Sequence, residues 1–247
     1  TLPQNYTLLS KMDYDHAGRP LTVKKTFNGG TEKTVSASSY NELGQLKTKT
    51  LGAAIETLNY DYNIRGWMLG MNRSYLTVQA QGGTNKFGFE LAYDKLTSNT
   101  GQSFTAAQYN GNIAGMAWKS DGDDTRRIYN FAYDNANRLL KGDFKQQNPD
   151  DNLWNNTQIN YSVQMGDGIN ATSAYDANGN ILKMIQYGWK LGVASTTPID
   201  NLTYNYTAAS NKLLNVIDAN NVAVTKLGDF RTSLLHPVQS KTATTVD

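Results

Sequence analysis

Apolar and polar residues alternate along several stretches of the chain. The alternation is clearest over residues 55–62, 127–133 and 202–206. A period of two is typical of β-strands that bury one face, because successive side chains point to opposite sides of the sheet. In each stretch the tyrosines and other apolar residues fall on the same face. The pattern therefore predicts antiparallel strands with aromatic side chains paired across neighbouring strands.

A seven-residue unit recurs where these strands end. It reads Tyr, Asp or Asn, two variable residues, Gly or Asn, a sixth residue that is polar in most copies, and Leu, Ile, Met or Pro. A side-chain oxygen at the second position accepts backbone N–H bonds two residues on, and Gly or Asn at the fifth tolerates positive φ. The unit thus predicts a β-hairpin with a type I turn and a G1 bulge. In the five clear copies the first, second and fifth positions are Tyr14, Asp15 and Gly18; Tyr40, Asn41 and Gly44; Tyr62, Asn63 and Gly66; Tyr133, Asp134 and Asn137; and Tyr175, Asp176 and Gly179.

Weaker copies of the unit begin at Tyr93, Tyr109 and Tyr206. In the copy at Tyr109, the β-branched Ile113 would occupy the position that needs positive φ, so this turn must differ. The first tyrosines of successive copies stand 16 to 42 residues apart, which indicates hairpins with loops of variable length. Polar inserts over residues 79–86, 97–102, 146–156 and 193–200 are typical of surface loops.

These patterns predict an all-β fold, an extended and twisted antiparallel sheet of repeated β-hairpins. We divide the sequence into a lead segment (residues 1–10), a repeat domain (11–230) and a tail without the repeat (231–247). The strands at the two ends of such an array have open edges, and open edges pair with other strands unless something covers them. We therefore expect flanking segments of a longer protein, or an oligomer, to cover them.

The composition fits this fold and excludes several classes of protein. The chain of 247 residues has 27 Asn, 21 Gly and 15 Tyr, but only two His and no Cys, which excludes disulfides and thiolate chemistry. With 18% charged residues and a net charge of +2, there is no basic surface typical of nucleic-acid binding. No apolar run is long enough to span a membrane. The N-terminal residues contain no signal peptide and no initiating Met, and we take the chain to be a piece of a longer precursor.

The repeated unit resembles the YD repeat of the RHS family. That family includes bacterial RHS proteins, the shell subunits of insecticidal toxin complexes, and teneurins. The resemblance implies a long sheet of hairpins that spirals into a hollow shell, secreted or displayed at the cell surface, around a C-terminal polypeptide. The chain has too few repeats to close such a shell, and it lacks the family's Asp-Pro-x-Gly region with its self-cleaving aspartates. We therefore interpret it as a segment of a repeat array or as an unusual short member of the family.

Chemistry-bearing residues are few, and each has a structural interpretation. Asp121, Asp123 and Asp124 could ligate Ca²⁺, although we interpret them as a solvated loop because an EF-hand's closing Glu is missing. A glycosidase would need a pair of carboxylates that the sequence does not single out. His16 and His236 have no evident nucleophile beside them. The candidate glycan contacts are Trp67, Trp118, Trp154 and Trp189, for which packing within the sheet is the alternative.

The sequence therefore favours a structural scaffold, an RHS/YD-repeat segment of a secreted or surface-displayed toxin-like protein. It predicts no catalytic residue, no metal and no cofactor. The expected partners are flanking repeats or an encapsulated C-terminal polypeptide of the parent protein, with no nucleic acid and no membrane span. The alternative function is carbohydrate binding through exposed aromatic residues of the sheet.

Overall fold

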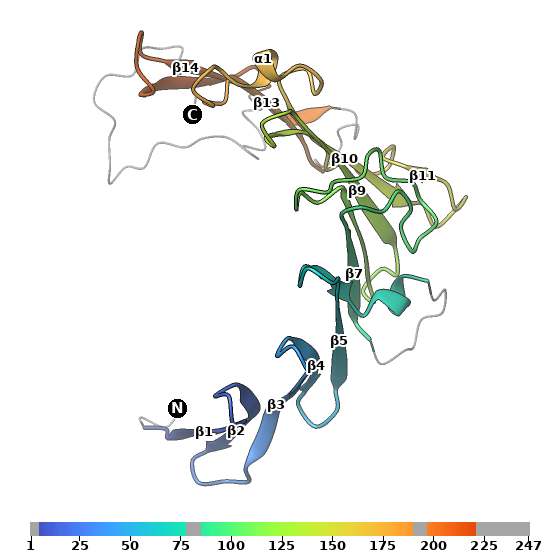
Figure 1. The fold of residues 1–247 in the computed structure, drawn as a ribbon, viewed down its shortest axis with the longest axis vertical. Coiled ribbons are helices and arrows are strands. Elements are labelled where there is room, and N and C mark those ends of the chain that lie inside the picture. The colour runs from blue at the N-terminus through green and yellow to red at the C-terminus, as the bar shows by residue number, and fades with distance from the viewer. Residues whose placement is uncertain (1–4, 78–84, 190–196, 221–247) are drawn as a thin grey trace. The chain divides into compact units, whose positions relative to one another are not determined.

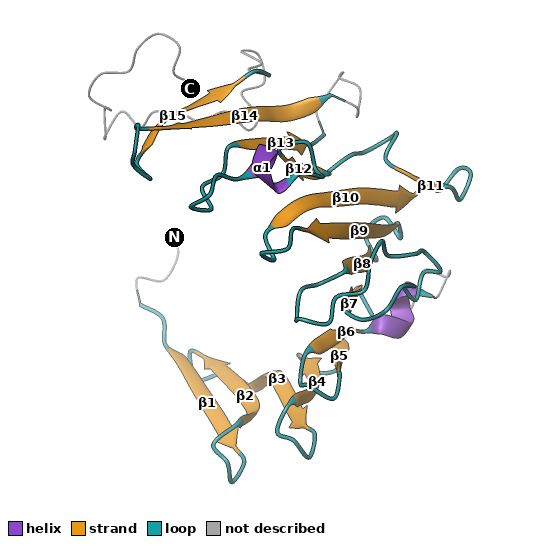
Figure 2. Ribbon diagram, turned by 45° about the horizontal axis from the view of Figure 1, so that its top comes forward, coloured by secondary structure: helices purple, strands orange, loops and turns teal. Residues whose placement is uncertain are grey.

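The chain folds into antiparallel strands joined by tight turns. The computed structural model describes residues 5–77, 85–189 and 197–220. Within this part the helices are one 3₁₀ turn, η1 (Arg73–Leu76), and one α-helical turn, α1 (Ala171–Ala174), both purple in Figure 2. None of the described helices is long and apolar enough to cross a membrane. The predicted all-β fold of antiparallel hairpins is confirmed.

The chain divides into two compact units, and the division falls within β8 (Gly115–Ser120). Unit 1 comprises Thr1–Ala92, Thr97–Gln102 and Ala117–Arg126, and unit 2 comprises Tyr93–Leu96, Ser103–Met116 and Arg127–Asp247. The seven-residue unit occurs in both, which is why the sequence pattern shows no boundary between them.

Unit 1 contains strands β1 to β7, and each strand pairs antiparallel with the next one along the chain (Figure 1). Among the described strands β1 pairs with β2 alone, so it forms an edge. It begins at Leu8, inside the segment that the sequence assigns to the lead. The strands are β1 (Leu8–Tyr14), β2 (Pro20–Phe27), β3 (Lys33–Tyr40), β4 (Leu46–Leu51), β5 (Glu56–Tyr62), β6 (Met68–Met71) and β7 (Phe87–Ala92).

Unit 2 contains the strands from β9 onward, hydrogen-bonded in the order β9-β10-β12-β13-β14-β15, while β11 pairs with the end of β10. Two of the expected loops are therefore partly strand: β11 lies within residues 146–156, and β14 begins before residue 200. The strands are β9 (Arg126–Tyr133), β10 (Leu139–Gln147), β11 (Trp154–Asn155), β12 (Val163–Met165), β13 (Lys183–Tyr187), β14 (Pro198–Tyr206) and β15 (Leu213–Asp218).

Five of the described hairpins contain a bulge just after the turn. In the first, Asp13 pairs with Thr22 and Tyr14 with Pro20, so that Leu21 is left without a partner in the ladder. A bulge increases the local twist of the strands and redirects the side chains that follow. The same register shift follows the turns at Tyr40, Tyr62, Tyr133 and Tyr206, where it leaves out Lys47, Leu69, Leu140 and Leu214.

The two units bury different kinds of residue. In unit 2 the buried set is mainly apolar and includes Phe144 and Ile128. Tyr129 lies opposite Phe144 in the ladder, and their rings meet edge to face at 5.4 Å, as the predicted cross-strand aromatic pairing requires. In unit 1 charged side chains share the interior with apolar ones, since Glu90 and Lys119 are almost completely buried.

The strands at the edges of the two units expose apolar side chains. Leu8, Leu9 and Met12 of β1 are each half exposed. In unit 2, Leu213 of β15 is about half exposed and Leu214 is 65% exposed. Single exposed apolar residues are ordinary, but a row of them along an edge strand is typical of a surface that another segment covers.

Candidate functional site: a spine of hairpin turns

The turns are built by the side chain at the second position of the unit. In the first copy, Oδ1 of Asp15 accepts hydrogen bonds from the backbone N–H groups of Ala17 and Arg19, both at 2.9 Å. The N–H of Gly18 donates to the carbonyl oxygen of Asp15, and the N–H of Asp15 donates to that of Arg19. This is the hydrogen-bond pattern of a type I turn with a G1 bulge, so the predicted turn class is confirmed.

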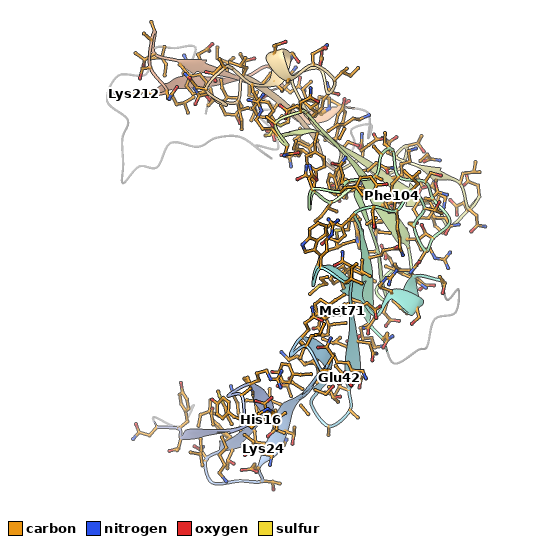
Figure 3. The ribbon with its side chains drawn as sticks, viewed as in Figure 1. His16, Lys24, Glu42, Met71, Phe104 and Lys212 are labelled. Atoms are coloured by element: carbon orange, nitrogen blue, oxygen red, sulfur yellow. The ribbon has the colours of Figure 1, made fainter. Side chains whose placement is uncertain are left out.

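The other four clear copies repeat these bonds. In each, Oδ1 of the second residue accepts the N–H groups of the fourth and sixth residues at 2.8–3.0 Å. Figure 3 shows two exposed third-position residues, His16 and Glu42, on their hairpin turns. Positive φ at the fifth position, as predicted, is found at Gly18 (77°), Gly44 (79°), Gly66 (80°), Asn137 (63°) and Gly179 (87°).

The copy at Tyr109 is different, as the sequence predicted. Positive φ falls on Gly111, at 100°, and not on Ile113. A β-branched residue is strongly disfavoured in that region of φ, because its side chain would collide with the backbone. Moving the positive φ to the glycine avoids this strain.

The second residue also holds the side chain at the sixth position. Oδ2 of Asp15 accepts a hydrogen bond from Nε of Arg19 at 2.6 Å, and Oδ2 of Asp134 accepts one from Nε of Arg138 at 2.7 Å. Where the sixth residue is an amide, the same contact is made at 2.8 Å, as between Asn180 and Asp176. One carboxylate thus fixes the backbone of its own turn with one oxygen and aims a side chain with the other.

That side chain reaches the next turn along the chain. The guanidinium of Arg19 lies over the ring of Tyr40, 4.7 Å from its centroid, and that of Arg138 lies over the ring of Tyr175 at 4.4 Å. Both tyrosines occupy the first position of the following copy. A cation over an aromatic face contributes about 0.5–1 kcal/mol at exposed sites and more when it is desolvated.

The first-position tyrosine makes a second contact with the turn before it. The hydroxyl of Tyr40 donates to the carbonyl oxygen of Pro20, and that of Tyr175 donates to the carbonyl oxygen of Leu139, which are the seventh residues of the preceding copies. Tyr206 makes the same bond to Ile181 at 2.9 Å. We call this row of contacts between successive turns the turn spine.

The fifth residue of each following turn lies close to the sixth residue of the turn before. A Cβ built on Gly44 would lie 2.6 Å from Nη1 of Arg19. One built on Gly66 would lie 3.2 Å from Nε2 of Gln45. Glycine therefore serves two purposes at Gly44: it adopts positive φ, and it leaves room for the guanidinium.

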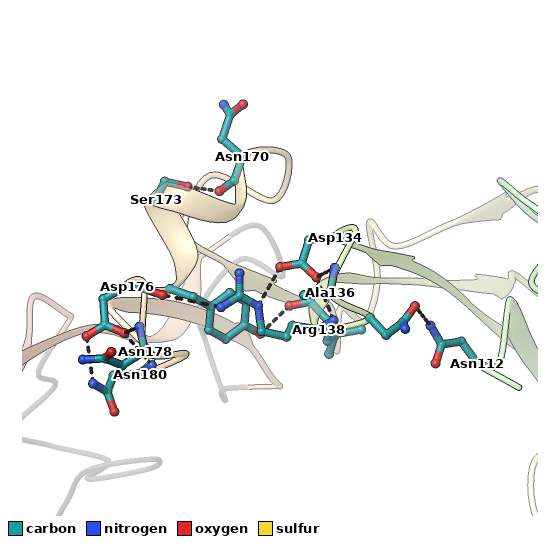
Figure 4. Close-up of polar contacts among 12 residues, drawn as sticks. Asn112, Asp134, Ala136, Arg138, Asn170, Ser173, Asp176, Asn178 and Asn180 are labelled. Carbon is teal, nitrogen blue, oxygen red and sulfur yellow. Dashed lines mark hydrogen bonds and ion pairs between the residues drawn. The ribbon is translucent and has the colours of Figure 1, made fainter. Parts of the chain in front are cut away.

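Amide side chains replace the guanidinium in other steps of the spine. Oδ1 of Asn137 accepts hydrogen bonds from Nδ2 of Asn110 and Nδ2 of Asn112. Two turns further along, Oδ1 of Asn211 accepts bonds from Asn178 and Asn180, both at 2.9 Å. Figure 4 shows the turn from Asp134 to Arg138 beside the turn from Asp176 to Asn180. Some of the many asparagines of this chain thus form the hydrogen bonds between turns.

The same hydrogen bonds keep the turn carboxylates charged. The N–H group and guanidinium of Arg19 hold the pKa of Asp15 below its usual value, despite partial desolvation. Burial raises the pKa of Asp134, but the hydrogen bonds from Arg138 and Ala136 outweigh it, and the net pKa is lowered. The amide of Asn180 lowers the pKa of Asp176. A charged carboxylate keeps both oxygens as acceptors, as the turn requires.

The four tryptophans that the sequence marks as candidate glycan contacts lie on separate elements. Trp67 is the sixth residue of its turn, and the guanidinium of Arg65 lies over its ring, 5.0 Å from the centroid. Trp118 is in β8 and Trp154 in β11, and both are partly buried. Trp189 follows β13 and is 52% exposed, which makes it the most accessible of the four.

The acidic residues Asp121, Asp123 and Asp124 are more than a solvated loop. Asp121 pairs with Nζ of Lys86 at 2.8 Å, and Asp124 pairs with Nζ of the buried Lys119 at 2.6 Å. Asp123 accepts a hydrogen bond from the N–H of a neighbouring residue. In the described part of the chain, no group of three or more His, Cys, Asp or Glu residues could hold a metal ion. Two of these carboxylates thus serve as counterions for lysines.

Sequence reasoning missed the buried polar residues of unit 1. Asn72 is 2% exposed, and its backbone is in the left-handed region, with φ of 48°. Its side chain forms hydrogen bonds with backbone groups of β5 and β7. Glu56 accepts hydrogen bonds from this side chain and from the N–H of Lys86. No repeat includes these residues, so the sequence held no signal for them. His236 lies outside the described residues.

Comparison with known proteins finds distant structural matches. No family model and no curated protein matches the chain. The crystal structure of TcdB2-TccC3-Cdc42 matches at 14% identity with a TM-score of 0.35, and that of TcdB2-TccC3 at 13% with 0.33. The Tc holotoxin pore of Photorhabdus luminescens matches at 14% with 0.31. Each match covers 85% of this chain and only 12–13% of the other chain.

Toxin-complex proteins are one of the groups that the repeat resembles, and the matched structures belong to that group. At these identities and TM-scores the likeness supports no step of a functional argument. The function proposed below therefore rests on the contacts within this chain.

Two glycines test the turn spine, because they have nearly the same φ but different surroundings. Replacing either Gly18 or Gly44 by Ala should cost about 1–2 kcal/mol through backbone strain. A Cβ on Gly18 meets nothing within 4 Å, whereas one on Gly44 displaces Arg19 from Tyr40. We therefore expect Gly44→Ala to cost about 0.5–1 kcal/mol more, measured by urea denaturation.

The control for this comparison is the same pair of substitutions in an Arg19→Ala background. There the extra cost of Gly44→Ala should vanish, because no guanidinium remains to be displaced. Equal costs for the two glycines in the parent sequence would contradict the assignment.

Proposed function

We propose that the chain is a non-enzymatic structural scaffold, an RHS/YD-repeat segment of a secreted or surface-displayed toxin-like protein. The observation that carries this proposal is the turn spine. The clear turns are each fixed by their own carboxylate or amide, and within each unit successive turns contact one another through a small set of recurring residue types. Such an array grows by adding hairpins, and its stability is approximately a sum of neighbour contacts.

The exposed edges support flanking hairpins as the partners of this scaffold. The apolar side chains of β1 and β15 face solvent in the described structure. A further hairpin on either edge would cover them and complete the strand pairing. The second partner that we propose is a C-terminal polypeptide of the parent protein, which the assembled array would enclose.

The scaffold proposal predicts that the spine protects whatever the parent protein encloses. Arg138→Ala in the full-length parent protein should open the array and expose the enclosed polypeptide to protease, because it removes the contacts with Asp134 and Tyr175. The measurement is the rate of limited proteolysis. Lys141→Ala is the matched control, since this lysine is on the neighbouring strand and 41% exposed. Unchanged protection in the Arg138 variant would count against the proposal.

Carbohydrate binding is the second candidate function, and a small cavity in unit 2 favours it. The cavity has a volume of about 270 Å³ and is lined by residues of β10, β12 and β13. Asn160 and Ser162 line it and are each 6% exposed. Oδ1 of Asn160 accepts the N–H of Ser162, and Oγ of Ser162 accepts the N–H of Phe144. The amide hydrogens of Asn160 remain as donors.

The rim of this cavity favours a neutral ligand that carries hydroxyl groups. Nζ of Lys141 and Oδ1 of Asp143 lie 3.3 Å apart there and balance each other's charge. Tyr187 adds an aromatic side chain to the lining. The volume is below that of a drug-sized site, which suits a single sugar ring. The exposed Trp189 stands two residues further along the chain.

This second function predicts that Asn160→Ala and Trp189→Ala each weaken binding on a glycan array at least tenfold. The first substitution removes the amide donors and the second the exposed ring. Circular dichroism should show an unchanged fold, and Trp154→Ala is the matched control, because this tryptophan is partly buried in β11. No binding by the parent chain, or equal binding by all variants, would exclude carbohydrate recognition through these residues.

A further inference from the structure

The last described step of the turn spine lacks the arginine that two earlier steps contain. At the sixth position Arg19 and Arg138 each place a guanidinium between their own aspartate and the next tyrosine. In the copy that begins at Tyr175 this position is Asn180, whose side chain is shorter and uncharged. It keeps the bond to Asp176, and it also contacts Asn211 of the next turn.

A hollow of about 590 Å³ lies along this step. Its lining includes the turn carboxylate Asp176, the tyrosines Tyr204 and Tyr206, and the amides Asn178 and Asn211. Asp176 is the one charged side chain among the described lining residues. Tyr206 is the first residue of the next copy, and its hydroxyl makes the spine bond to the carbonyl oxygen of Ile181. The hollow thus contains the partners that hold a guanidinium in the two arginine copies.

We propose that this hollow binds an arginine side chain of a partner polypeptide. The partner's guanidinium would take the place that Arg138 occupies one turn earlier, with Asp176 as its counterion and the ring of Tyr206 beneath it. This interaction goes beyond the scaffold role. It rests on the geometry of the turn spine and not on the identity of the parent protein.

Arginine fits this hollow better than lysine for physical reasons. A guanidinium is planar, so it can lie flat on a tyrosine ring while its edge donates to a carboxylate oxygen. An ammonium is compact and strongly hydrated, and it gains less from the aromatic face. Arg138 shows both contacts at once, at 2.7 Å from Oδ2 of Asp134 and 4.4 Å from the centroid of Tyr175.

The experiment titrates the full chain with three blocked tripeptides while its backbone amide resonances are followed by NMR. The tripeptides are Gly-Arg-Gly, Gly-Lys-Gly and Gly-citrulline-Gly, and citrulline keeps the shape of arginine without its charge. We expect the arginine peptide to shift the resonances of Asn178, Tyr206 and Asn211 in a saturable way, with a Kd in the millimolar range. The other two peptides should bind at least fivefold more weakly.

Two variants locate the bound guanidinium. Asn180→Arg should abolish peptide binding, because the chain's own guanidinium then occupies the hollow. Asp176→Asn should weaken arginine binding at least fivefold without loss of the turn, since Asn41 and Asn63 build the same turn with an amide.

A third variant carries the test to another turn. Arg138→Asn should create a second hollow of the same kind, with new arginine-dependent shifts at Tyr175 and Gly179. The proposal is overturned by equal binding of the three peptides, by the absence of saturable shifts, or by full binding to the Asn180→Arg variant.

Discussion

The structure depends on the side chain of the Asp or Asn at the second position of each turn. Oδ1 closes the turn by accepting two backbone N–H groups, and in the aspartate copies Oδ2 holds the side chain of the sixth residue in place. A long side chain at the sixth position would otherwise lose conformational entropy when it contacts the next turn. The carboxylate fixes this side chain before that contact is made. The side chain that forms each of these turns therefore also positions the residue that packs against the next hairpin.

This arrangement explains how a chain with little apolar core can form an ordered array. The bonds between turns are polar and aromatic, and they use Asn, Arg, Tyr and Gly, which are abundant or recurrent in this sequence. The same residue types are candidates for catalysis or ligand binding in other proteins. Here they are engaged by neighbouring turns wherever the spine is complete. The proposed arginine ligand binds where a shorter side chain, Asn180, replaces the arginine and a hollow lies beside the turn.

The turns could be predicted from the sequence, and the contacts between them could not. Period-two alternation and the Tyr-Asx-x-x-Gly unit contain the information for strands, for positive φ at Gly44 and for the different turn near Ile113. The contact of Arg19 with Tyr40 depends on which hairpins become neighbours, and that is a property of the sheet. The buried Asn72 and the ion pair of Lys119 lie outside the repeat, so no pattern marked them. The residues that line the cavity beside Asn160 also lie outside the repeat, so the sequence pattern did not indicate this cavity.

The central claim is that the sixth residue of one turn and the first residue of the next are energetically coupled. A double-mutant cycle on Arg138 and Tyr175 measures this directly, with Arg138→Ala, Tyr175→Leu and the double variant compared by chemical denaturation. The account predicts that the two losses are not additive and that the coupling energy is about 1 kcal/mol, as for a cation over an aromatic ring. Losses that add within about 0.3 kcal/mol would contradict it, because the two side chains would then act independently.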